Sequence, residues 1–137
     1  MSTNGTIFRA KINGWATATQ AQIEGLARQT CFQMAENVVR STPVDTGFLR
    51  GSWQPSINGP ADEPGSADPS GVATIAEVML SANGMTPGDT FYMLNNAKYA
   101  RHVEYGTSKM AGRHYVGDNV AKWPAVVAKV AKELNIK

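Results

Sequence analysis

The residues in this sequence that could carry chemistry are two histidines, two acids and one cysteine. His102 and Glu104 lie two residues apart, and His114 and Asp118 follow them. A zinc deaminase uses a similar His-x-Glu pair, but it needs cysteines farther along the chain, and Cys31 lies upstream. Residues two apart on a helix also point to different sides, which disfavours a metal site built from this pair. We therefore expect no metal site.

Cys31 is also a weak candidate for a nucleophile. It falls in a segment of helical periodicity, where the sequence indicates no neighbouring base or positive charge that would lower the pKa of the thiol. A single cysteine forms no internal disulfide and supplies no thiolate zinc site by itself. No glycine-rich loop of the phosphate-binding kind follows a strand pattern. The sequence therefore predicts neither an enzyme nor a bound cofactor.

The basic C-terminal third suggests a different function, the binding of nucleic acid. Residues 98–137 contain eight Lys or Arg and three acidic residues, interleaved with Tyr99, Tyr105, Tyr115 and Trp123. Basic side chains bind phosphates, and aromatic rings stack on bases. Solvated lysines on a helix and aromatic residues in a core explain the same pattern, and the sequence pI of about 8.8 lies below the value of about 9 typical of nucleic-acid-binding domains. A basic nucleic-acid-binding module therefore stays an alternative.

The charge is unevenly distributed along the chain, although the net charge is only +2. Residues 51–97 contain five acidic residues and no Lys or Arg, in contrast to the basic residues 98–137. This distribution can serve solubility alone, but opposite charges on two faces also favour contact between neighbouring copies. The candidate interface residues are the acids Asp62, Glu63, Asp68, Glu77 and Asp89 on one side and the bases Lys98, Arg101, Lys109 and Arg113 on the other.

Length and composition indicate one globular domain over residues 1–137, with residues 1–14 as an N-terminal arm. The chain has 42% hydrophobic and 18% charged residues, which is typical of a soluble protein with a single core. No run approaches the roughly 20 apolar residues that a membrane span requires, so we expect no membrane partner. No signal-peptide pattern opens the chain, so we expect synthesis in the cytoplasm.

The helices that would position these residues follow from periodicity and from capping residues. A capping-box pattern at Thr17 opens a long amphipathic helix, which Pro43 must end. A short helix carries His102 and Glu104 and stops at Gly106. A last helix begins at Asp118, and Pro124 inside its pattern predicts either a kink or a late true start.

Alternation of apolar residues predicts short strands over residues 52–57, 72–80 and 90–94. Between the first two lies a long acidic loop over residues 58–71, whose composition indicates either mobility or ordering by a partner. The expected fold class is therefore α+β. In this fold, a long N-terminal helix and a C-terminal helix pack on a small antiparallel sheet, with a short helix before the last one.

The expected helix and the first strand meet at a corner over residues 41–53. Pro43 stops the helix, and Gly47 is free to adopt a positive φ that strains other residues. The side chain of Asp45 can accept hydrogen bonds from the amides that follow. Arg50 is placed to reach back toward Asp45 or outward toward a partner.

Two runs of this sequence resemble one known family. Residues 42–52, T-P-V-D-T-G-F-L-R-G-S, are similar to a signature of the head-tail joining and tail-completion proteins of tailed bacteriophages, and residues 96–107 are similar to the family's Y-A-x-x-V-E-x-G-T segment. Gly51, the loop over 58–71 and the region of Pro124 depart from the family pattern. The matching residues are Pro43, Asp45, Thr46, Gly47, Leu49, Arg50 and Ser52 in the first run and Tyr99, Ala100, Val103, Glu104, Gly106 and Thr107 in the second.

The resemblance implies a structural protein of the virion neck and no enzymatic activity. It implies a homo-oligomeric ring, six-fold in preference to twelve-fold, with neighbouring neck, adaptor and tail proteins as partners. Contact with packaged DNA in the channel is a further implication, and a tail terminator is the alternative subtype. In this interpretation Asp45 and Arg50 fix the corner, while Tyr99 and Glu104 fix the short helix against the sheet.

Overall fold

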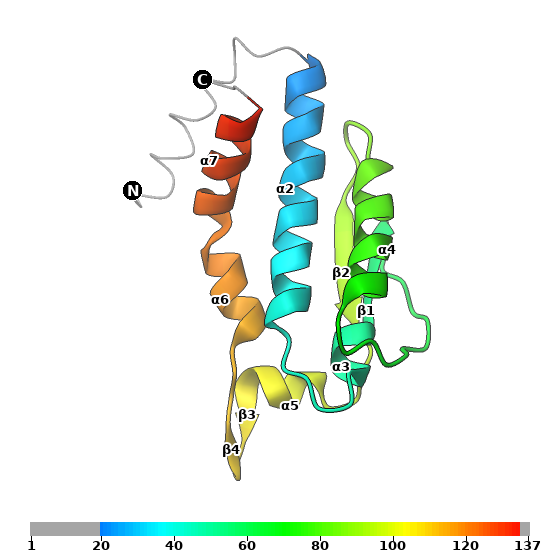
Figure 1. Cartoon of the computed structure of the whole chain (residues 1–137), viewed down its shortest axis with the longest axis vertical. Coiled ribbons are helices and arrows are strands. Elements are labelled where there is room, and N and C mark those ends of the chain that lie inside the picture. The colour runs from blue at the N-terminus through cyan, green and yellow to red at the C-terminus, as the bar shows by residue number, and fades with distance from the viewer. Residues whose placement is uncertain (1–19, 135–137) are drawn as a thin grey trace.

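A computed structural model of the chain describes residues 20–134 (Figure 1). Helices alternate with two small antiparallel sheets, which confirms the predicted α+β class. In chain order the elements are α2 (Gln20–Ser41), α3 (Phe48–Gly51), β1 (Trp53–Ile57), α4 (Val72–Asn83), β2 (Phe91–Asn95), α5 (Ala100–Tyr105), β3 (Gly106–Thr107), β4 (Met110–Ala111), α6 (Tyr115–Ala121) and α7 (Trp123–Glu133).

The long helix α2 is the central element. In Figure 1 it lies between α6 and α7 on one side and α4 with the β1–β2 sheet on the other. Its buried face carries Leu26, Thr30, Ala35, Val38 and Val39. The predicted end before Pro43 is confirmed, whereas the predicted start at Thr17 and the N-terminal arm lie outside the described residues.

The C-terminal helix α7 packs chiefly on α2. Leu26 of α2 forms a buried cluster with Val126, Val130 and Ala131 of α7. Pro124 occupies the first turn of α7, where its missing amide costs no hydrogen bond. The residues before it form the separate helix α6, so the prediction of a late true start at Pro124 is confirmed.

The segment over residues 72–80, predicted to be a strand, belongs to the helix α4. Its buried residues recur with helical spacing, at Thr74, Ile75, Val78 and Ala82. The prediction was wrong because β-branched residues at alternating positions are equally typical of a strand, whereas packing of this face on α2 selects the helix. Gly71, with φ +77°, precedes the first turn.

The two other predicted strands are confirmed as β1 and β2. They pair antiparallel, with Trp53 opposite Asn95 and Ile57 opposite Phe91. The predicted stop at Gly106 is also confirmed, since this residue has φ +88° and ends α5. The basic loop beyond it contains a hairpin, β3 with β4, that the sequence did not predict.

The acidic loop over residues 58–71 contains no helix or strand but is tied to the rest of the chain. The Gln54 side chain exchanges hydrogen bonds with the Glu63 backbone, and the Asp68 amide donates to the Gly47 carbonyl at 2.9 Å. The loop therefore contacts both β1 and the corner within a single copy of the chain. Within residues 20–134, no helix has the length and apolarity needed to cross a bilayer.

Candidate functional site

Arg50 clamps the corner by donating to backbone carbonyls. Its guanidinium lies 3.0 Å from the Arg40 oxygen, 2.9 Å from the Thr42 oxygen and 2.7 Å from the Pro69 oxygen. The Arg40 carbonyl lies in the last turn of α2, where carbonyls lack partners within the helix, and Thr42 directly follows the helix. A cation there also interacts favourably with the helix dipole. Arg50 therefore joins the end of α2 to the loop that leads into α4.

Arg50 takes neither of the two directions expected for it, back toward Asp45 or outward toward a partner. Asp45 is exposed, and all the hydrogen bonds of the Arg50 side chain go to carbonyls. An exposed ion pair contributes only about 0 to 1 kcal/mol, whereas fixed carbonyls at a helix end otherwise remain without partners. Thr46 does act in the turn, because its hydroxyl accepts a 3.3 Å hydrogen bond from the Phe48 amide.

Three glycines allow the acidic loop to lie directly on the corner. Gly47 has φ +87°, and a Cβ there would lie 2.5 Å from the Pro69 nitrogen. A Cβ on Gly51 would overlap the Ser66 carbonyl, and one on Gly65 would overlap the side chain of Ser52. Two departures from the family pattern, Gly51 and the loop over 58–71, are therefore parts of one packing arrangement.

A buried hydrogen bond joins the end of α2 to β1. Thr42, which is 1% exposed, donates from Oγ1 to the Val38 carbonyl at 2.7 Å and accepts from Trp53 Nε1 at 2.9 Å. The Trp53 ring meets Tyr115 of α6 edge-on, with centroids 6.5 Å apart. Burial, with a smaller contribution from the Glu104 charge, raises the pKa of Tyr115 to about 12. Thr42 and Trp53 belong to the corner, but the predicted set of structural residues did not include them.

Glu104 fixes α5 against α6. The resemblance had implied that it would fix this helix against the sheet. The carboxylate is buried and accepts hydrogen bonds of 2.9 Å from the Val116 and Gly117 amides. These amides open α6, where backbone donors lack partners within the helix and a negative charge is favourable. Tyr99 directly precedes α5 and is exposed. It is 41% exposed and lines an open cleft with Phe48 and the acidic loop.

The two family-like runs meet in one core. Leu49 and Trp53 from the corner pack in the same cluster as Ala97, and Ala100 and Val103 pack against it. Asn95 adds a polar link, because its side chain donates to the Leu49 carbonyl at 2.8 Å. The smaller motif residues have local roles: Ser52 donates to the Phe48 carbonyl, Thr107 accepts from the Lys109 amide, and Gly106 lies too close to Gly112 for a Cβ.

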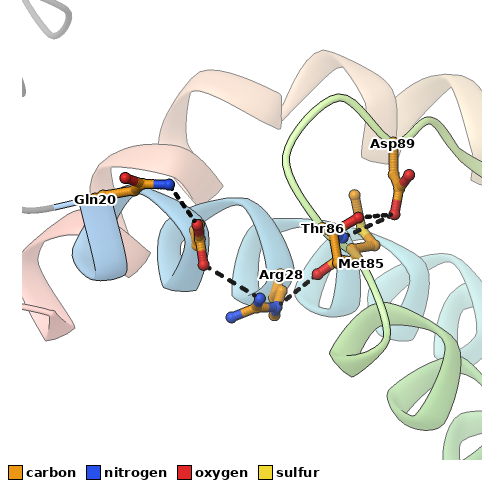
Figure 2. A network of polar contacts seen from close by, with 6 residues as sticks. Gln20, Arg28, Met85, Thr86 and Asp89 are labelled. Atoms are coloured by element: carbon orange, nitrogen blue, oxygen red, sulfur yellow. Dashed lines mark hydrogen bonds and ion pairs between the residues drawn. The ribbon is translucent and has the colours of Figure 1, made fainter.

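A polar network fixes the other end of α2 (Figure 2). Arg28 bridges the Glu24 carboxylate at 3.4 Å and the Met85 carbonyl at 2.9 Å, while Gln20 donates to Glu24 at 3.1 Å. The Asp89 carboxylate next to it accepts from the Thr86 amide at 2.7 Å and from its hydroxyl at 2.9 Å. The turn after α4 is therefore held to α2 by side-chain contacts that the sequence pattern did not indicate.

Three of the five candidate interface acids, Asp62, Asp68 and Asp89, accept hydrogen bonds within the subunit itself. Asp68 accepts from the Thr74 amide at 2.9 Å and from its hydroxyl at 2.8 Å, and these bonds lower the pKa of Asp68. The bonds from Thr86 and Asn58 lower the pKa of Asp89 in the same way. Asp62 accepts from the Asn96 side chain at 2.8 Å, whereas Glu63 and Glu77 are exposed.

The candidate bases lie exposed around α5 and the β3–β4 hairpin. Arg101 lies 5.9 Å from the centre of the Tyr105 ring, and Lys98, Lys109 and Arg113 are exposed as well. In the described part of the chain, the only ion pairs are those between α2 residues. The acidic and basic candidate residues are therefore not paired with one another within one subunit.

The residues first considered for chemistry do not form a reactive group. Among residues 20–134, no cluster of histidine, cysteine or acidic side chains is arranged to hold a metal ion. Burial raises the pKa of the Cys31 thiol, which makes it a poorer nucleophile. His102 is exposed, and His114 precedes α6 with φ +50°.

No protein-family model, curated protein or solved structure matches this chain. Its functional interpretation therefore rests on the two sequence runs and on the geometry of the residues within them.

Proposed function

We propose that this chain is a structural protein of a tailed-phage virion. In this proposal it forms a ring in the neck, completes the tail and joins it to the head. The proposed family rests on the resemblance of residues 42–52 and 96–107 to the head-tail joining and tail-completion proteins. The observation that carries the proposal is that Arg50 and Glu104, charged residues of these runs, bind backbone groups at helix ends.

This use of charge favours a structural role over catalysis. A catalytic arginine or carboxylate faces a site that a substrate can enter, at a distance suited to the reacting atoms. Arg50 instead joins α2 to the acidic loop, and Glu104 joins α5 to α6. The two runs therefore specify the shape of the subunit, and its exposed surfaces are left for contacts with other proteins.

A second candidate is the binding of nucleic acid by the surface around α5. Arg101 stacks over Tyr105, and both side chains are exposed beside other basic residues. Such a surface attracts phosphates and stacks on bases. A shift of labelled DNA by the purified chain that weakens steeply with salt would favour this function over a purely structural one.

The direct test is reconstitution of head-tail joining. Particles made without this chain should accumulate as separate filled heads and tails, and addition of the purified chain should restore joined particles. Native mass spectrometry of the purified chain should give a closed oligomer, with six copies expected and twelve as the alternative. The exposed variant His102→Ala should join heads to tails as the parent does.

Two results would contradict the proposal. The first is that heads and tails join equally well without the chain. The second is that finished particles do not contain the chain. A folded His102→Ala protein that fails to join heads to tails would instead direct attention back to a chemical role for this histidine.

A further inference from the structure

Helix α4 is apolar on both of its faces. Its inner face, with Ile75 and Val78, packs on α2. Its outer face carries Val72 and Leu80, which are 70% and 76% exposed, and Met79, which is 45% exposed. Large apolar side chains on the solvent side of a helix are normally covered by another element or another protein. No part of the chain between residues 20 and 134 covers this outer face.

The surroundings of this outer face are acidic. A cavity beside Leu80 is lined by Glu63 and Glu77, together with Pro55 of β1. The carboxylates of Glu63 and Glu77 have no ion pair in the described part of the chain. Since residues 51–97 contain no Lys or Arg, a cation that neutralises these two acids has to come from elsewhere.

A second exposed surface, with basic residues in place of acidic ones, lies on α5 and the β3–β4 hairpin. Tyr105 is 69% exposed and Met110 is 48% exposed, so this surface is apolar at its centre. Arg101 lies over the Tyr105 ring, and Lys109 and Arg113 are exposed nearby. A guanidinium held over an aromatic ring is already oriented to bind carboxylates.

The two surfaces lie apart on one subunit. Figure 1 shows α4 alongside α2, whereas α5 and the hairpin lie beyond the C-terminal end of α2. The surfaces therefore do not close on each other within one copy. We infer that the outer face of α4 is a docking surface for a second copy of this chain, which binds it through the Arg101–Tyr105 pair and the hairpin.

This contact is heterologous, because two different faces meet. Each copy has one face of each kind, so copies add head to tail, and they form a ring where the rotation between neighbours closes. Leu80 and Tyr105 form the apolar centre, and the unpaired acids and bases form the rim, where they fix orientation. The inference names the surfaces through which copies would meet in the proposed neck ring. The location of this ring in the virion rests on the proposed function.

The test uses two variants of the full chain, each defective on one face. Leu80→Lys removes apolar area from the α4 face and places a cation opposite Arg101. The double variant Arg101→Ala with Tyr105→Ala removes the ring and the charge from the other face. All three side chains are exposed, so both variants should retain the far-UV spectrum and thermal midpoint of the parent. Val120→Lys, at a position that is 58% exposed on α6, is the matched control.

We expect each defective variant alone to associate at least about tenfold more weakly than the parent in sedimentation velocity, as loss of an interface centre requires. The Val120→Lys control should assemble as the parent does. A mixture of the two defective variants retains one intact pair of faces, so it should form 1:1 dimers that do not grow further. High salt should weaken association of the parent, because the rim is charged.

Several outcomes would overturn the inference: a parent that stays monomeric, a Leu80→Lys variant that assembles normally, or a mixture of folded variants that forms no dimer. Loss of assembly in Leu80→Lys alone, with the double variant unaffected, would show that the second copy does not bind α4 through the Arg101–Tyr105 pair. Failure of the neck proposal is distinguishable, because it is measured in particles. A chain that assembles as expected but is absent from virions would contradict the neck proposal and leave the docking surface intact.

Discussion

The indole nitrogen of Trp53 donates a 2.9 Å hydrogen bond to the hydroxyl of Thr42, and neither side chain is open to solvent. The same hydroxyl donates to the Val38 carbonyl, so one oxygen serves as acceptor and donor. This pair holds the end of α2 against the first residue of β1. It therefore fixes the direction in which the chain leaves the corner.

Replacing Thr42 with Val should destabilise the fold. The isosteric change keeps the volume but leaves the buried Trp53 N–H without an acceptor, which costs about 1 to 3 kcal/mol. Urea denaturation followed by tryptophan fluorescence measures the loss. Thr46→Val, at an exposed position of the same corner, is the control and should change the free energy of unfolding much less. Equal losses in the two variants would show that the buried hydrogen bond is not the cause.

Gly47→Ala should also lower stability, by about 1 to 3 kcal/mol, because the residue has a positive φ and its new Cβ would meet Pro69. The control is Gly59→Ala in the acidic loop, where a Cβ meets no atom within 4 Å. Thermal unfolding of the two variants gives the comparison. An unchanged midpoint for Gly47→Ala would contradict the close packing of the loop on the corner.

Glu104→Gln should loosen the joint between α5 and α6. The neutral amide has one carbonyl oxygen in place of two charged acceptors, so the hydrogen bond to either Val116 or Gly117 is lost and the other is weakened. We expect a loss of about 1 to 3 kcal/mol in the free energy of unfolding. Glu77→Gln on the exposed face of α4 is the control and should leave the monomer as stable as the parent.

Asp68 makes stability depend on pH in the acid range. The hydrogen bonds that Asp68 accepts from Thr74 lower its pKa in the folded protein below 3.8. The folded protein therefore binds a proton at Asp68 less readily than the unfolded chain does. The stabilisation is complete above the unfolded pKa and is lost as pH falls through the folded pKa. In Asp68→Asn, the free energy of unfolding should therefore fall less steeply below about pH 4 than in the parent. Identical slopes in the two proteins would exclude this contribution.

The sequence predicted the elements whose signals are local. Pro43 marked the end of α2, and Gly106 marked the end of α5. Short apolar runs with turn residues on both sides predicted β1 and β2. In each case the residues that determine the element lie within a few positions of it.

The remaining features depend on contacts between distant residues. The β-branched residues of α4 fit a strand or a helix, and packing on α2 decides between them. The acceptors of Arg50 are backbone carbonyls, which every residue has, so the sequence pointed only to Asp45 or to an outside partner. The hairpin after Gly106 has only two residues in each strand, which is too short for a periodic pattern.

The space that a Cβ on Gly51 would need is occupied by the Ser66 carbonyl, so the residue type at position 51 and the path of the loop depend on each other. A side chain at position 51 and a loop on this path exclude each other, so neither can change without the other. A related chain with a larger residue at the position of Gly51 must lift the loop from the corner or shorten it. In an alignment of such chains, the residue type at this one position would therefore report the path of the loop.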